Sequence, residues 1–161
     1  MDDIYFITGL SRRGEVASLR SHTVGGGITI LDYIAWYCLA NTRTVGIQVP
    51  INAIVNMSMN IIVDTLVWIM GSKSLRQASR PVMFYASQCM QPIVFDWCTT
   101  LLGSMKTQLT ECKERKDKKF GYGSILCSFF FERVPGLSSR VDVPPHSLRN
   151  LALTRWAEIL T

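Results

Sequence analysis

The sequence predicts a mainly α fold, an irregular bundle of five to six helices joined by glycine- and proline-rich connections. Three observations predict it: apolar residues recur at helical spacing, glycines and prolines separate these stretches, and no run of alternating strands occurs. The chain has 161 residues, of which 48% are hydrophobic and 18% charged, which suffices to bury one core. We therefore expect a single helical domain over 1–161.

The first part of the chain divides at its glycines and prolines. A short apolar element over 4–7 ends at Gly9, and residues 30–40 have the apolar spacing of a helix of about three turns. Pro50 suits the first turn of a further helix, which Gly71 ends.

The stretch 44–72 raises the question of a membrane span, because Asp64 is its only charged residue. Polar residues recur in it at every fourth position: Asn52, Asn56, Asn60 and Asp64. On a helix they form one polar stripe, whose members would cost free energy in hydrocarbon without partners. The pattern favours a helix buried by protein, with a membrane anchor through 50–70 as the alternative.

The next part of the chain predicts three helices. Ser79 is placed to cap the first, with Pro81 in its first turn and Pro92 after its end. Asp96 is placed to cap the second, whose apolar residues are expected to form one continuous face: Trp97, Leu101, Leu102, Met105, Leu109 and Cys112. The third covers roughly 124–134 and stops at Pro135.

A last helix is predicted after the proline pair at 144–145, with Ser147 as its cap. Its apolar residues have helical spacing: Leu148, Leu151, Ala152, Trp156, Ile159 and Leu160. Thr161 follows them without a capping glycine or a polar tail, so we expect the chain to be a fragment of a longer protein.

Aromatic residues concentrate in one block, which contains Phe120, Tyr122 and the triplet 129–131. We expect these rings in the core, where each can bury about 150–250 Å². The alternative is a platform on which nucleic-acid bases stack. Such a platform needs basic residues among exposed rings, and none lies within 129–131.

The cysteines indicate the compartment. Their number is odd and no Cys-x-x-Cys pair occurs, which disfavours structural zinc. We expect buried free thiols in a reducing compartment: Cys38, Cys89, Cys98, Cys112 and Cys127. The acidic start at Asp2 and Asp3 differs from the basic start of a signal peptide, so we expect an intracellular protein.

Candidate catalytic groups are few. We expect His22 and His146 to face solvent in loops, and the glycines at 25–27 lack the lysine of a phosphate-binding P-loop. A two-metal nuclease needs clustered carboxylates, for which the candidates are Asp32, Asp64 and Glu111. Both aspartates fall on helical faces rather than at strand ends, so this hypothesis is weak. We expect a domain that is not an enzyme and has no catalytic residue, metal or cofactor.

The basic residues gather in two segments. Seventeen Lys and Arg against twelve Asp and Glu give a net charge of +5, which tolerates an anionic partner without demanding one. Residues 111–119 carry five basic and three acidic side chains, which is typical of a solvated helix end. The alternative is contact with nucleic acid, for which the candidates are Arg12, Arg13, Arg20, Lys113, Arg115, Lys116, Lys118 and Lys119.

A family resemblance begins at residues 3–15, DIYFITGLSRRGE. The segment resembles the plant mobile domain family, in which an aspartate-led apolar helix ends in Gly-Leu and another glycine follows, here at Asp3, Gly9, Leu10 and Gly14. Three later stretches are similar to the same transposon-derived, retroelement-associated plant proteins: FDWCTTLLGSMKTQLTECK, KKFGYGSILCSFFFERVP and HSLRNLALTRWAEIL. The resemblance implies a mainly helical domain, a nuclear setting, and a role in transposon biology or silencing without a settled reaction.

Residues and resemblance together predict a non-enzymatic, transposon-derived interaction module. Its expected partners are a weakly held nucleic acid or another protein, and no small-molecule substrate or membrane is expected. Two alternatives stay open. One is the membrane-anchored protein described above, and the other is relic coding sequence without a selected function.

Overall fold

The computed structural model describes residues 2–44, 46–71, 76–134 and 136. Over these residues the elements are α1 (Asp2–Thr8), α2 (Ile30–Tyr37), β1 (Gln48–Pro50), the 3₁₀ helix η1 (Ile51–Ala53), α3 (Met57–Ile69), β2 (Gln77–Ser79), α4 (Arg80–Cys89), α5 (Trp97–Glu114) and α6 (Gly123–Arg133). The predicted helical class is confirmed. The helix expected after Ser147 lies outside the described residues.

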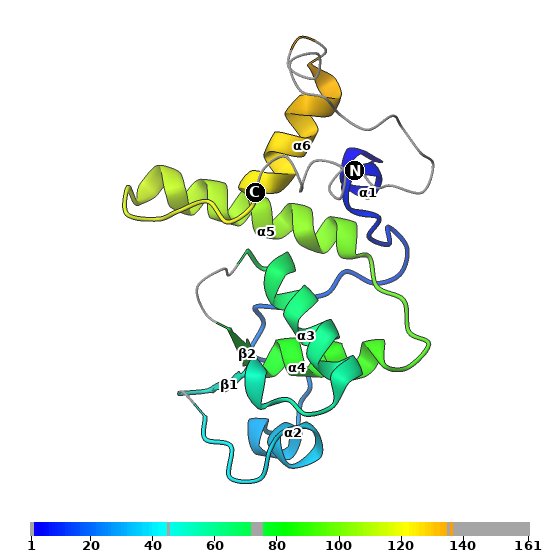
Figure 1. Ribbon diagram of the computed structural model, residues 1–161, viewed down its shortest axis with the longest axis vertical. Coiled ribbons are helices and arrows are strands. Elements are labelled where there is room, and N and C mark those ends of the chain that lie inside the picture. The colour runs from blue at the N-terminus through cyan, green and yellow to red at the C-terminus, as the bar shows by residue number, and fades with distance from the viewer. Residues whose placement is uncertain (1, 45, 72–75, 135, 137–161) are drawn as a thin grey trace.

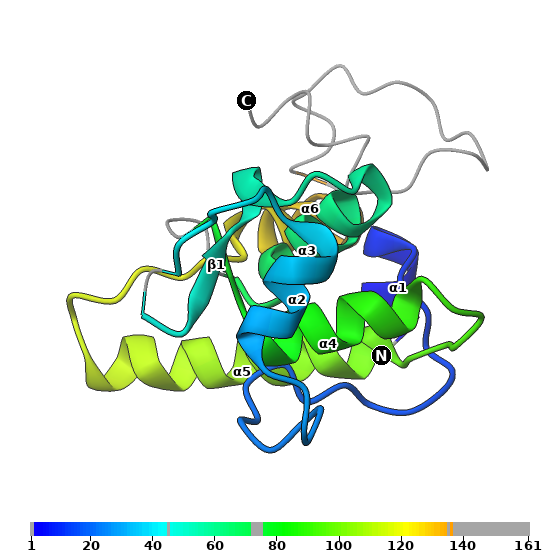
Figure 2. The ribbon, with the colours of Figure 1, turned by 90° about the horizontal axis from the view of Figure 1, so that it is seen from below.

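Helix α5 crosses the middle of the molecule and separates two groups of elements. Figure 1 shows α1 and α6 on one side of it, and α2, α3, α4 and the two strands on the other. One cluster of buried residues joins both groups, with Ile7 of α1, Met59 of α3, Met83 of α4, Leu101 of α5 and Ile125 of α6 among its members. The last turns of α5 extend past the other elements in both views (Figures 1 and 2).

The two short strands correct the prediction for Pro50. Pro50 ends β1, which pairs with β2 in antiparallel register, Val49 opposite Ala78. The following α-helix begins later, at Met57, because the Asn56 side chain accepts a hydrogen bond from the Met59 N–H at 2.9 Å. Gly71 has a φ of +71° and follows this helix, which confirms it as the stop.

The polar stripe predicted on one helix is wrong in its first half. Asn52 belongs to η1, Asn56 caps α3, and only Asn60 and Asp64 lie within α3. The Asn60 amide donates to the Ile51 carbonyl at 2.8 Å, so it ties the preceding turn to α3. Of the helices in the described ranges, none has the length and hydropathy required of a bilayer-crossing segment.

The starts of α4 and α5 agree with the prediction in position, but only one cap forms. Asp96 accepts a hydrogen bond from the Thr99 N–H at 2.9 Å, which confirms it as the cap of α5. Ser79 precedes α4, and Pro81 lies in its first turn. The Ser79 hydroxyl, however, is buried and makes no cap hydrogen bond, and Ser79 is also the last residue of β2.

The buried face of α5 is shorter than predicted. Leu101 and Met105 are buried as expected, together with Cys98 and Thr100. Leu109 is 43% exposed, because the end of the helix extends past the body of the molecule (Figure 1).

The aromatic and cysteine predictions hold in part. Tyr122 is buried and Phe120 and Phe129 pack against the core, but Phe130 is 51% exposed. Consecutive helical residues point in different directions, so α6 turns Phe129 toward the core and Phe130 toward solvent. All five cysteines are free, but only Cys98 is fully buried, so the expectation that all are buried is wrong.

Candidate nucleic-acid interface

An extended segment, residues 15–20, runs alongside α5. It starts at Glu15, which forms a parallel bridge with Phe95. The Glu15 carbonyl accepts a hydrogen bond from the Asp96 N–H at 2.8 Å. Further along, the Ala17 N–H donates to the Thr100 hydroxyl at 3.1 Å. Ala17 and Leu19 are buried while their neighbours in the segment are exposed, as in a half-buried strand. The segment thereby carries Arg20 toward the last turns of α5.

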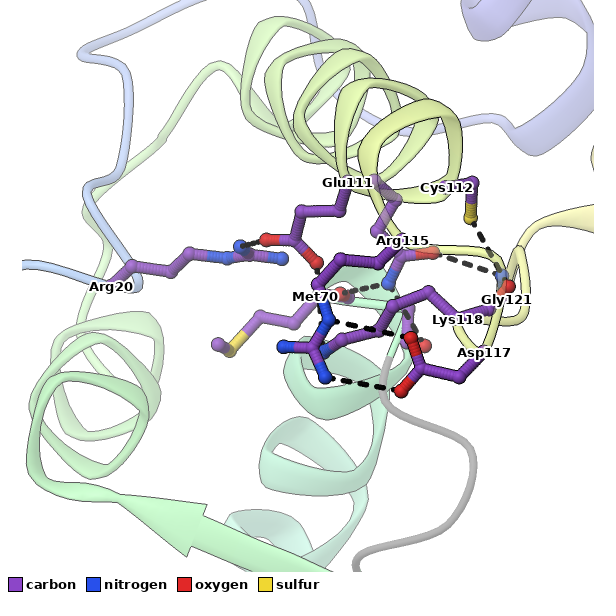
Figure 3. Close-up of polar contacts among 10 residues, drawn as sticks. Arg20, Met70, Glu111, Cys112, Arg115, Asp117, Lys118 and Gly121 are labelled. Carbon is purple, nitrogen blue, oxygen red and sulfur yellow. Dashed lines mark hydrogen bonds and ion pairs between the residues drawn. The ribbon is translucent and has the colours of Figure 1, made fainter.

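Glu111 joins the two predicted basic segments. Its carboxylate lies 3.4 Å from the Arg20 guanidinium and 3.8 Å from the Lys118 ammonium (Figure 3). Arg20 comes from the segment beside α5, and Lys118 comes from the loop that follows the helix. Two cations far apart in the sequence therefore converge on one carboxylate.

The remaining candidates divide between the two ends of α5. Lys113, Arg115, Lys116 and Lys119 are exposed near Lys118, and Arg115 pairs with Asp117 at 3.0 Å. We call Arg20, Lys113, Arg115, Lys116, Lys118 and Lys119 the basic end of α5. Arg20 and residues 111–119 together carry six basic and three acidic side chains, a net charge of +3.

Arg12 and Arg13 do not belong to this surface. The Arg12 guanidinium lies 5.0 Å from the centre of the Tyr5 ring in α1. The neighbouring Ser11 carbonyl accepts the Cys98 N–H at 2.9 Å, which places this segment at the first turn of α5. A helix of 18 residues is about 27 Å long, so the predicted candidates form two separate groups.

Gln108 holds the loop after α5 in place, and sequence reasoning missed it. Its amide oxygen accepts the Gly121 N–H at 2.9 Å, and its amide nitrogen donates to the carbonyls of Met70 and Gly71, each at 3.2 Å. These partners lie in two other segments, so no local pattern could reveal the role of Gln108.

Tyr122 fixes the far end of the same loop. Its hydroxyl donates to the Ile69 carbonyl at 2.7 Å. Burial raises the pKa of Tyr122 to about 12, so the hydroxyl keeps its proton and remains a donor near neutral pH. Gln108 and Tyr122 together anchor the basic loop to the end of α3.

The structure does not assemble the proposed acidic triad. Asp32 forms a capping box with Thr29 at the start of α2, and these hydrogen bonds lower its pKa. Asp64 is exposed on α3, and Glu111 pairs with the basic residues described above. In the described part of the chain, no three His, Cys, Asp or Glu side chains gather as a metal site would require.

The remaining candidate groups are the two histidines and the run of glycines at 25–27. His22 is exposed in a loop, as predicted, and its backbone carbonyl accepts a hydrogen bond from Arg80; His146 lies outside the described residues. Gly25 has a φ of +73°, and a Cβ there would lie 2.9 Å from the Phe84 ring. Packing against Phe84 thus explains one glycine of the run at 25–27.

Fold and site together define a helical domain with a cationic surface at one end of its central helix. Comparisons of the chain with protein-family models, with curated proteins and with solved structures found no match.

Proposed function

We propose that this domain is a non-enzymatic binding module that contacts the phosphates of nucleic acid through the basic end of α5. The observation that carries the proposal is the convergence of Arg20 and Lys118 on Glu111. The Glu111 carboxylate lies between these two cations. A phosphate oxygen is also anionic and can take the place of the carboxylate oxygen beside them.

The nature of the contact follows from the side chains involved. Lysines and arginines on an exposed helix end neutralise phosphates and release counterions, so affinity falls as salt rises. With a local net charge of +3, we expect weak binding that depends little on base sequence.

The biological setting is proposed from the resemblance to the plant mobile domain family. Gly9 and Gly14, two of the matching positions, have φ values of +70° and +98°, which supports a local backbone requirement for glycine at both. A module of transposon origin that acts in the nucleus, in transposon biology or silencing, would meet nucleic acid there.

The proposal is tested by removing charge at one end of α5 only. We expect Lys116→Gln with Lys119→Gln to weaken binding to a fluorescently labelled single-stranded oligonucleotide about tenfold at about 50 mM salt. The slope of log affinity against log salt should fall by about 1.4, because each lost phosphate contact contributes about 0.7. Fluorescence anisotropy measures both quantities.

The matched control removes the same charge elsewhere, with Arg13→Gln and Arg43→Gln, two exposed residues outside the basic end. This control should bind within about twofold of the unmodified protein. Equal weakening by both double variants, or no binding by the unmodified protein at about 50 mM salt, would contradict the proposal.

A further inference from the structure

A shallow groove lies between the extended segment and α5, and the basic end does not account for it. It has a volume of about 290 Å³ and is bounded by residues 16–21 on one side and by α5 residues between Thr99 and Thr107 on the other. Its size is at the lower limit of typical ligand pockets, about 300–1,000 Å³. The groove therefore has room for a short segment of a polymer.

The lining of the groove has one chemical character. Six of its eleven residues carry a hydroxyl group: Ser18, Ser21, Thr99, Thr100, Ser104 and Thr107. The three threonines donate their hydroxyl protons within the protein, to Asp96 and to the Gly103 carbonyl, so the donors for a ligand come from the serines and Arg20. Arg20 is the only ionisable residue in the lining. The Arg20 guanidinium also pairs with Glu111, so the groove opens directly onto the basic end of α5.

Gly103 lies in the groove wall, in the interior of α5. A glycine at such a position costs about 1 kcal/mol of helix stability relative to alanine. A Cβ at Gly103 would meet no atom within 4 Å, so no close packing requires the glycine. Because Gly103 has no side chain, the groove stays open at this position.

We propose that this groove seats the sugar–phosphate backbone of a nucleic-acid strand, whose neighbouring phosphates lie on the basic end of α5. Serine and threonine hydroxyls and arginine are the groups that commonly contact phosphate and sugar oxygens. A groove with a single guanidinium and three serine hydroxyls fits a chain that alternates phosphates with polar sugars. The inference rests on the function proposed above and adds the path of the strand along α5.

The test fills the groove without changing charge. Gly103→Leu places a side chain in the open space, and Gly103→Ala is the matched control, since alanine and leucine have similar helix propensity. Both variants should unfold at a higher denaturant concentration than the unmodified protein. Gly103→Leu should bind a labelled single-stranded oligonucleotide of about 12 nucleotides roughly tenfold more weakly, and Gly103→Ala within about threefold.

Inorganic polyphosphate provides the second arm, because it has the charge of the strand but no sugars. Its binding to Gly103→Leu should change by less than about threefold, since the arginines and lysines of the basic end can hold it without sugar contacts in the groove. Unchanged oligonucleotide affinity in Gly103→Leu, or equal weakening for both ligands, would overturn the groove proposal. If Lys116→Gln with Lys119→Gln still weakens binding in that case, the proposed function survives, whereas failure of that variant overturns the function itself.

Discussion

Replacing Gly14 by alanine is expected to lower the free energy of unfolding by about 3 kcal/mol. Gly14 has a φ of +98°, which L-residues rarely adopt, and an alanine Cβ would clash with the Val94 carbonyl oxygen. The clash is with backbone, so a side-chain rotation cannot relieve it. The chain would have to move apart where Glu15 pairs with Phe95.

Urea unfolding followed by circular dichroism measures this effect. Gly26→Ala is the control, because Gly26 lies in a turn, a Cβ there meets nothing within 4 Å and its φ is not positive. We expect the control to change stability by less than about 0.5 kcal/mol. If Gly14→Ala is no more destabilising than Gly26→Ala, then Gly14 does not pack against the Val94 backbone at the start of the extended segment.

Replacing Gln108 by leucine is expected to cost about 2 kcal/mol and also to weaken nucleic-acid binding. Leucine has nearly the same size but leaves the Met70 and Gly71 carbonyls and the Gly121 N–H without their partner. The loop that carries Lys118 would then be attached to the end of α3 through Tyr122 alone.

The same unfolding and anisotropy measurements apply, with Thr110→Ala as the control. Thr110 is exposed on the same helix, and its hydroxyl bonds only within α5, to the Lys106 carbonyl at 3.1 Å. The control should stay within about 0.5 kcal/mol. A Gln108→Leu protein that is as stable as the control and binds as tightly as the unmodified chain would show that the Gln108 hydrogen bonds do not position the basic loop.

Local signals in the sequence predicted much of the fold. Asp96 begins α5, Pro81 lies in the first turn of α4, and Gly71 ends α3, because capping and φ restriction act within a few residues. These signals fixed the helical class and the main breaks between helices.

The differences between the predicted and the observed fold come from contacts between segments far apart in the sequence. Pro50 looked like a helix start, but its neighbour Val49 pairs with Ala78, and nothing near residue 50 reports that partner. The exposure of Leu109 likewise depends on where the body of the molecule ends.

The candidate site shows the same contrast between local sequence signals and long-range contacts. Composition identified the basic residues, but the sequence did not indicate that Arg20 would join Lys118 while Arg12 would not. That separation follows from the path of residues 15–20 along α5, which buried Ala17 and Leu19 hold in place. Its only sequence signal is a weak alternation of apolar and polar residues.

The most direct measurement of the central claim is the oligonucleotide affinity of Glu111→Gln. If phosphate replaces the Glu111 carboxylate beside Arg20 and Lys118, removing that charge should raise the affinity about fivefold at low salt, the equivalent of about 1 kcal/mol. Glu15→Gln adds the same charge at the other end of α5 and should change affinity less than twofold. Equal effects of the two variants, or weaker binding by Glu111→Gln, would contradict an anion site at the basic end of α5.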